Sequence, residues 1–126
     1  MRLLAFLGLA IITAACSTNP DKNITLSEKA YYDAAQKSLS YGNFDTASKH
    51  LEELESHYPV GAYTEQAKLD LIYARYKHLD YAGAMSAAER FIRLYPLNTQ
   101  LDYAYYIRAL ASFDMDKDAF LRFIPL

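Results

Sequence analysis

The sequence lacks tryptophan and holds one cysteine, four glycines and four prolines in 126 residues. A single cysteine cannot form an intramolecular disulfide, so disulfides do not stabilise this fold. No glycine-rich phosphate loop and no nucleophile elbow is present, and the three histidines do not have the spacing of metal ligands. We therefore expect a non-enzymatic protein without a metal or a cofactor.

An excess of charge of one sign is also lacking. Thirteen Lys and Arg face fifteen Asp and Glu, which gives a net charge of −2, and the basic residues are scattered along the chain. Without a basic stripe to neutralise phosphates, nucleic acid is not an expected partner. The 52% hydrophobic and 22% charged content is that of a globular chain with room for one small domain.

The first fifteen residues have the pattern of a lipoprotein signal peptide. Arg2 precedes an apolar run over residues 3–12, which is too short to span a bilayer, and small residues then lead to Cys16. Bacterial lipoproteins carry their lipidated cysteine at this place, so we expect a covalent lipid on Cys16. An ordinary signal peptide with an unpaired thiol is the alternative. Residues 16–24 are polar and predict a flexible tether. The residue after the cysteine is Ser17 and not Asp, and by resemblance to enterobacterial sorting signals this implies the outer membrane.

Two matching stretches, residues 42–59 and 81–96, are offset by 37 residues and end in Tyr-Pro. A period of about 34 residues with small residues at helix crossings and a closing proline is typical of tetratricopeptide (TPR) helical hairpins. We predict an all-α TPR solenoid with TPR 1 at 25–59, TPR 2 at 60–96 and, over 97–126, only the first helix of TPR 3. Such arrays present surfaces that bind other proteins.

Local signals place the helices of the first two repeats. A capping box over residues 25–28 predicts a helix over 26–40, which Gly42 ends, and Asn43 caps the next helix. Thr64 is the expected N-cap of the third helix. The following turn has Leu79 where the first repeat has glycine, so we expect different turn chemistry there.

The third repeat is expected to begin with a helix over 100–113 and a charged loop over 114–118. The chain then stops in mid-hairpin at residues 120–126, five of which are apolar. Because a repeat array needs a polar terminal cap, we expect a fragment or a shortened copy of a longer protein. The alternative is a small domain that dimerises through its C-terminal face.

Residues 58–63, 69–77, 90–96, 102–103 and 106–108 match more specifically than TPR spacing alone. They resemble the N-terminal half of the BamD (ComL/YfiO) family of outer-membrane protein assembly factors. The resemblance implies a lipoprotein anchored in the outer membrane, facing the periplasm, in the β-barrel assembly (BAM) complex. Its implied partners are the β-barrel core subunit, accessory lipoproteins and unfolded outer-membrane proteins. The alternative is another TPR lipoprotein that serves as a scaffold for cell-envelope enzymes.

Candidate binding residues fall into two groups. By the resemblance, the loop with Tyr58, Gly61 and Tyr63 matches the family's site for client signals. Gly61 could let a ligand backbone approach closely, or it could serve a positive-φ turn. The first helix of each hairpin lines the binding face of a TPR array, and the positions expected to be exposed there are Tyr32, Gln36, Leu39, Leu69, Tyr73, Tyr76, Tyr103, Tyr106 and Leu110.

Tyrosine suits an apolar, aromatic-ended peptide, although packing between helices is the plainer role for many of these rings. Arg75 and Arg108 could hold a peptide carboxylate through a forked contact. They could instead lie on a solvated face or pair with Asp70 or Asp102, and these possibilities stay open at the level of sequence.

Overall fold

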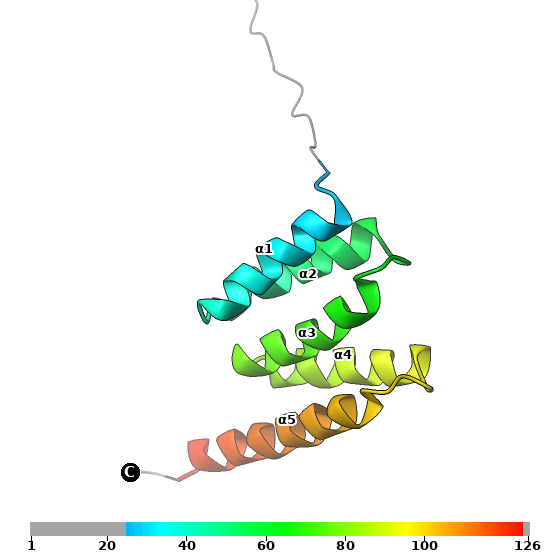
Figure 1. Ribbon diagram of the computed structural model, residues 1–126. Helices are drawn as coiled ribbons and strands as arrows, with labels where there is room; N and C mark the ends of the chain where they lie inside the picture. Colours follow the sequence, from blue (N-terminus) through cyan, green and yellow to red (C-terminus); the bar gives the residue numbers. More distant parts are fainter. Residues whose placement is uncertain (1–24, 125–126) are drawn as a thin grey trace, which may run out of the picture.

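The computed structural model describes residues 25–124, which are built from helices (Figure 1). The elements are α1 (Glu28–Ser40), α2 (Phe44–His57), α3 (Thr64–Lys77), α4 (Tyr81–Leu94) and α5 (Leu101–Arg122), and this part of the chain contains no strand. Two hairpins and the first helix of a third are present, so the predicted all-α TPR architecture is confirmed. The predicted signal peptide, the lipidation of Cys16 and the tether lie outside the described residues.

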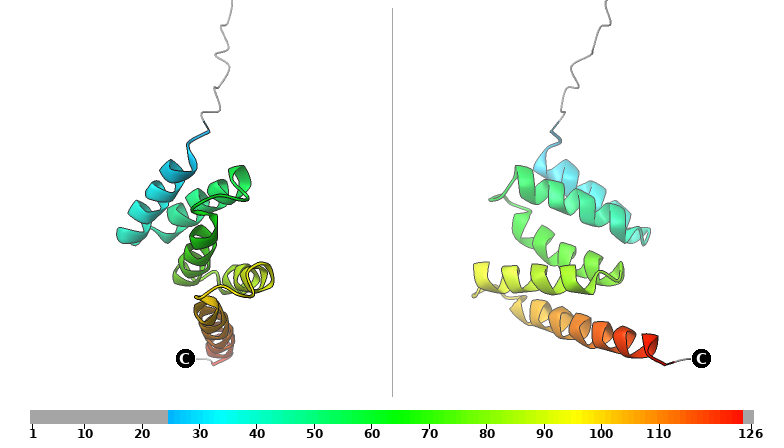
Figure 2. Two further views of the ribbon diagram at one scale, coloured as in Figure 1. Left: turned by 45° about the vertical axis from the view of Figure 1, so that its right-hand side comes forward. Right: turned by 180° about the vertical axis from the view of Figure 1, so that it is seen from behind.

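The helices are stacked in chain order, with α1 and α2 at one end of the stack and α5 at the other (Figure 2). Each helix packs against the next one in the chain, and α3 also contacts α5. Residues of α1 and α3 share the same apolar cluster, and Gln36 on α1 hydrogen-bonds to Asp70 on α3. The first helices of the hairpins, α1, α3 and α5, are therefore neighbours along one side of the stack. This side carries the candidate binding positions.

Two apolar clusters hold the stack together, and α3 contributes to both. The first cluster joins α1, α2 and α3 around Leu51, Leu54 and Leu71, and the second joins α3, α4 and α5 around Ile72 and Phe91. Leu71 and Ile72 are both fully buried although they point to different sides of one helix. Burying one such side chain is worth about 1.5–3 kcal/mol. Alanines at helix crossings let the backbones approach closely, as the repeat pattern predicts.

The turn between α1 and α2 and the turn between α3 and α4 have the same geometry. Gly42 has φ 71° and Leu79 has φ 65°. The amide of Gly42 donates to the carbonyl of Leu39 at 3.0 Å, and the amide of Leu79 donates to that of Tyr76 at 3.0 Å. The expectation of different turn chemistry at Leu79 is therefore wrong. The amide that follows each turn residue also closes the end of the helix, since Asp80 donates to the carbonyl of Arg75 and Asn43 to that of Ser38, each at 2.9 Å. Leu79 thus adopts the left-handed conformation that glycine adopts freely.

The helix starts differ from expectation at two places. Ser27, not Thr25, caps α1 through its hydroxyl, which accepts from the amide of Ala30 at 3.2 Å. The helix begins at Glu28, and the Glu28 carboxylate reaches the 61–64 loop instead of completing a capping box. Thr64 is the first residue of α3 and not its N-cap. The caps of α2 by Asn43 and of α4 by Asp80 have the usual side-chain geometry.

The charged loop expected at 114–118 is also wrong, because α5 runs without a break from Leu101 to Arg122. Residues 101–122 contain neither glycine nor proline, so nothing in the backbone ends the helix. The Asp114 carboxylate lies 3.9 Å from the ammonium of Lys117, one turn along. A run of charged residues at these spacings is compatible with a solvated helix face.

Candidate functional site

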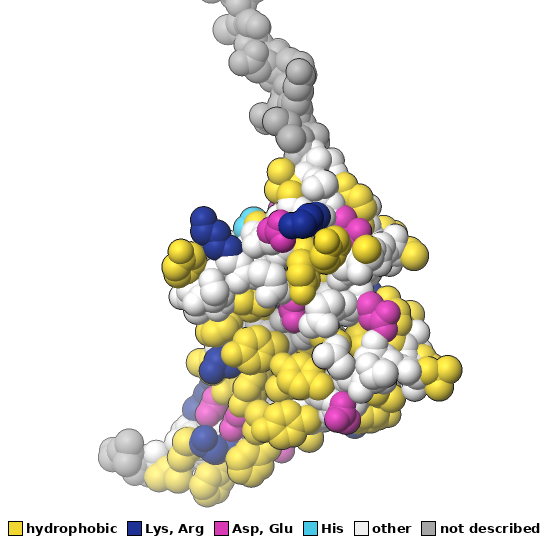
Figure 3. Space-filling model, viewed as in Figure 1, with side chains coloured by type: hydrophobic (Ala, Val, Ile, Leu, Met, Phe, Trp, Pro, Cys, Tyr) yellow, Lys and Arg dark blue, Asp and Glu magenta, His cyan; other side chains and the backbone are white. Residues whose placement is uncertain are grey.

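The side formed by α1, α3 and α5 is rich in tyrosine, and we call it the first-helix face. Hydrophobic side chains gather there over α3 and α5 (Figure 3). Tyr106 is the most open of the expected positions, with 61% of its surface exposed, whereas Leu69 is only 2% exposed and belongs to the second apolar cluster. Leu69 was therefore wrongly expected to be exposed. The remaining expected positions are partly buried: Tyr32, Gln36, Leu39, Tyr73, Tyr76, Tyr103 and Leu110.

Asp70 accepts the hydrogen bonds of the polar side chains that lie between α1 and α3. Its Oδ2 accepts a hydrogen bond from the Gln36 side-chain amide at 2.5 Å, and its Oδ1 accepts one from that of Gln66 at 2.9 Å. Burial and the nearby Asp70 carboxylate raise the pKa of Tyr32 to about 12. Sequence reasoning had not assigned Asp70 or Gln66 to the face, although their spacing of four residues places them on one side of a helix.

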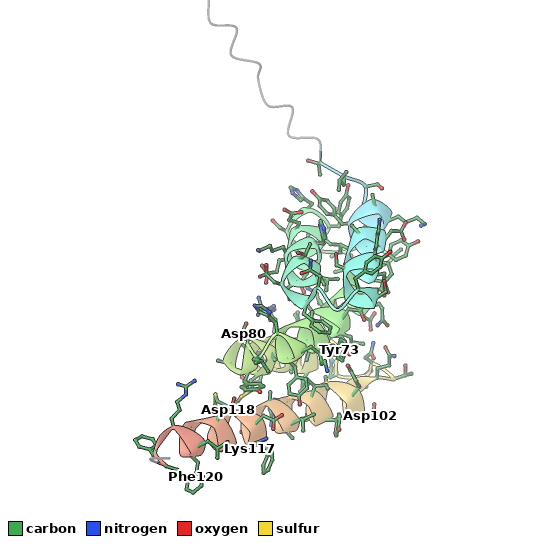
Figure 4. The ribbon with its side chains drawn as sticks, turned by 90° about the vertical axis from the view of Figure 1, so that its left-hand side faces the viewer. Tyr73, Asp80, Asp102, Lys117, Asp118 and Phe120 are labelled. Carbon is green, nitrogen blue, oxygen red and sulfur yellow. The ribbon has the colours of Figure 1, made fainter. Side chains whose placement is uncertain are left out.

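A cavity of about 250 Å³ opens between α3 and α5 on this face. It is lined by Gln66, Leu69, Asp70, Tyr73, Gln100 and Tyr103. Figure 4 shows that Tyr73 on α3 and Asp102 near the start of α5 lie on the same side of the molecule. Burial, followed by the neighbouring Tyr73 and Asp70, raises the pKa of Tyr103 to about 12. Two of the predicted tyrosines thus form one partly enclosed pocket.

Tyr76 lies further along α3 and takes part in packing. Its hydroxyl donates to the Asp114 carboxylate on α5 at 2.7 Å, and its ring centroid is 5.9 Å from that of Tyr81 on α4. The hydrogen bond to Asp114, followed by burial, raises the pKa of Tyr76 to about 12. This tyrosine ties α3 to α5 and offers less free surface than Tyr106.

The loop with Tyr58, Gly61 and Tyr63 is held by the start of α1. The Glu28 carboxylate accepts hydrogen bonds from the amides of Ala62 at 3.2 Å and Tyr63 at 2.7 Å. The Tyr58 hydroxyl donates to the carbonyl of Leu26 at 2.9 Å. The Glu28 carboxylate therefore fixes this loop at the N-terminus of α3, where a negative charge is favoured.

Gly61 has a structural reason to be glycine. Gly42 is the described glycine with positive φ, so the positive-φ turn considered for Gly61 is wrong. A Cβ atom at position 61 would overlap the Glu28 carboxylate. The close approach that glycine permits is made by Glu28 from within the chain.

Tyr63 extends the aromatic surface from this loop towards α1. Its ring centroid lies 4.9 Å from that of Tyr32, with an interplanar angle of 31°. Since Tyr32 belongs to α1, this pair closes one end of the first-helix face. Tyr58 and Tyr63 both retain part of their surface in contact with solvent.

Arg75 and Arg108 do not pair with Asp70 and Asp102, so that alternative is wrong. An Arg75 amino group donates to the Glu52 carboxylate at 2.7 Å, and the other donates to the carbonyl of Gly83 at 3.2 Å. Arg75 thus faces α2 and α4, because residues five apart on a helix point in different directions. Arg108 lies 3.9 Å from the Glu89 carboxylate on α4. Arg75 is engaged away from the first-helix face and does not offer a fork to a peptide there.

Comparison with known proteins decides the family. A family profile described as tetratricopeptide repeat matches residues 19–125. The chain belongs to the tetratricopeptide repeat family. The five helices described above are consistent with this family, since each hairpin corresponds to one repeat.

The repeat array is also similar to relatives named outer membrane protein assembly factor BamD. The protein of Vibrio cholerae is 42% identical over 103 residues, which cover 82% of this chain and 43% of that protein. The protein of Neisseria gonorrhoeae is 36% identical over 115 residues, covering 88% and 43% respectively. That of Buchnera aphidicola is 30% identical over 125 residues, covering 98% and 51%. The chain spans about half the length of these relatives or somewhat less, and the resemblance inferred from the sequence is confirmed.

The acidic and histidine side chains and the helix lengths of the repeat array bear on metal binding and membrane insertion. Within residues 25–124, the His, Asp and Glu side chains form no group of three that could hold a metal ion. None of the helices in the same range combines the length and the apolar character needed to cross a bilayer.

Proposed function

We propose that this chain is the client-binding part of a lipid-anchored outer-membrane protein assembly factor. The single observation that carries the proposal is the tyrosine-rich first-helix face with its cavity between α3 and α5. The names of the relatives support this assignment of process. An extended peptide with apolar and aromatic side chains matches such a face, since tyrosine rings bury large areas and keep a hydroxyl for backbone groups.

The proposed client is an unfolded outer-membrane β-barrel protein, bound through its aromatic-ended C-terminal segment. We place this segment along Tyr73, Tyr103 and Tyr106, with the loop at Tyr58 and Gly61 and the Tyr63–Tyr32 pair at the far end of the path. Binding and release are the whole of the proposed activity, and no covalent step is involved.

The proposed anchor is a lipid on Cys16, which holds the chain at the periplasmic side of the outer membrane. A single acyl chain binds a membrane only marginally, and two or more give stable attachment. The proposed partners are the β-barrel core subunit and the accessory lipoproteins of the BAM complex. A purified BAM complex that fails to retain the chain would contradict this placement.

The test of client binding uses a fluorescent peptide with the aromatic-ended sequence of a β-barrel C-terminus and the full chain with Cys16→Ser. We expect saturable binding that Tyr106→Ala weakens by about 1–2 kcal/mol, the range of a well-placed interface tyrosine. Tyr105→Ala is the matched control, because Tyr105 is 47% exposed and adjacent on the same helix but stacks with Arg108, its ring centroid 5.6 Å away.

Two outcomes would contradict the proposal. Absence of saturable binding by a chain with a normal helical spectrum removes the client role and favours a scaffold for cell-envelope enzymes. Equal losses for Tyr106→Ala and Tyr105→Ala remove the first-helix face as the site.

A further inference from the structure

The cavity between α3 and α5 has a distinct chemical character. Tyr73 and Tyr103 supply aromatic walls, Leu69 supplies an apolar floor, and Gln66 and Gln100 supply uncharged amides. Asp70 is the one lining residue that carries a formal charge. A pocket with aromatic walls and one carboxylate is electrostatically complementary to a cation with an apolar stem.

The Asp70 carboxylate is fixed in place but not neutralised. Each of its two oxygens accepts one hydrogen bond from an uncharged glutamine amide, Gln36 for one and Gln66 for the other. The Tyr32 hydroxyl also interacts with this carboxylate, which, after burial, helps to raise the pKa of Tyr32. An ionised carboxylate has about four acceptor positions, so acceptor capacity remains. None of the ion pairs between described residues includes Asp70, whereas Glu52, Glu55 and Glu89 each have an Arg or Lys partner.

We propose that this cavity binds the side chain of a Lys or Arg residue in the client peptide. The aliphatic stem lies between the rings of Tyr73 and Tyr103, and the cationic head reaches the Asp70 carboxylate. Long basic side chains bury their stems on apolar surfaces in this way, and a cation near an aromatic face gains a further attraction. The inference rests on the proposed function and names the side chain that this site selects.

The same charge excludes another occupant. A peptide C-terminal carboxylate placed in the cavity would face Asp70 without an intervening cation, and like charges at close range are unfavourable. The terminal carboxylate of a bound client therefore lies outside this cavity, and a basic residue upstream of the terminus enters it. The Asp70 charge thus sets the register of the peptide on the first-helix face, because it selects the residue that enters the cavity.

The test uses a set of aromatic-ended peptides in which a single lysine is the one charged side chain. The lysine is moved through successive positions, and each peptide has a copy with acetyl-lysine at the same position. For the full chain with Cys16→Ser, we expect one lysine position to bind roughly tenfold more tightly than its acetyl-lysine copy, which corresponds to about 1.4 kcal/mol. The advantage falls as salt rises, since part of the site is open to solvent.

Two variants locate the effect. Asp70→Asn keeps the shape of the side chain and is expected to abolish the preference for lysine over acetyl-lysine. Gln100→Lys places a competing cation at the rim of the cavity, at a residue that is exposed, and is expected to weaken the lysine peptide several-fold more than the acetyl-lysine peptide. Gln100→Lys still tests the proposal if Asp70→Asn weakens the packing of α3 against α1.

The outcomes separate the two proposals. If lysine and acetyl-lysine peptides bind equally at every position, or if Gln100→Lys weakens both alike, the basic pocket is refuted while client binding stands. If no peptide of either set binds the folded chain, the proposed function fails and the pocket assignment fails with it.

Discussion

Leu79 is a position where a single substitution should stabilise the protein. It adopts φ 65° in the turn between α3 and α4, and its side chain is 68% exposed, so it contributes little burial. A non-glycine residue in the left-handed region costs roughly 1–2 kcal/mol. Glycine removes that cost but loses about 0.5–1 kcal/mol through its greater freedom in the unfolded chain. We expect Leu79→Gly to raise the free energy of unfolding by about 0.5–1 kcal/mol.

The assay is urea and thermal unfolding of the purified chain, followed by far-UV circular dichroism. For a domain of this size, the gain corresponds to a rise in Tm of roughly 2–8 °C. Leu79→Ala is the control, because it removes the side chain but keeps a Cβ at a positive φ. Gly42→Ala is the reciprocal control: open space surrounds Gly42, so a loss of about 1 kcal/mol there would come from the backbone alone.

The comparison among these variants decides the reasoning. If Leu79→Gly is no more stable than Leu79→Ala, the left-handed turn is not strained and the argument fails. A neutral Gly42→Ala would refute it at the first turn as well. Equal effects in both repeats would show that the turns are interchangeable in energy as well as in geometry.

Three more substitutions test contacts that hold the first-helix face together. Glu28→Gln should lower the free energy of unfolding by about 1–2 kcal/mol, because hydrogen bonds to a charged acceptor are worth more than neutral ones; an unchanged urea midpoint would contradict the role of Glu28 in fixing the 61–64 loop. Gly61→Ala should destabilise the chain and should be tolerated better in a Glu28→Ala background, which removes the carboxylate that a Cβ would meet; additive losses would refute the clash. Tyr32, Tyr76 and Tyr103 have pKa values raised to about 12 from 10, so their stabilising contribution is present below pH 10 and is lost as pH rises towards 12. Tyr76→Phe should reduce the loss of stability over this alkaline range, measured by urea midpoints at each pH, and an unchanged pH profile would contradict the hydrogen bond to Asp114.

The sequence predicts the parts of the fold that depend on neighbouring residues. The stops at Pro59 and Pro96 and the turn at Gly42 follow from the backbone chemistry of proline and glycine, and the ends of α1 to α4 were placed within a few residues. The end of α5 was placed at residue 113, nine residues before Arg122. The loop expected at 114–118 was an error of interpretation, since charge alone does not end a helix. Leu79 shows the reverse case, where a residue adopts a backbone conformation that its local preference opposes.

The contacts that shape the candidate site were not predictable in the same way. Glu28 has the spacing of a capping-box residue, yet its carboxylate binds a loop more than thirty residues away. The orientation of the Asp70 carboxylate likewise depends on a hydrogen bond from Gln36 on another helix. Only the packing of the helices against one another shows which hydrogen-bond partner such a side chain binds. A consequence is that Gly61→Val, an obvious test of binding from the sequence, would perturb folding and binding together.

The position of α3 in both apolar clusters has a consequence for how the chain opens. Leu71 serves the first cluster and Ile72 the second, so the end helices can fray from either side while the other cluster stays intact. Disorder in α3 itself dismantles both clusters at once. Amide protons of α3 should therefore exchange with solvent most slowly, and protection should fall towards α1 and α5. The free energy of global unfolding of the repeat array is therefore set by the stability of α3.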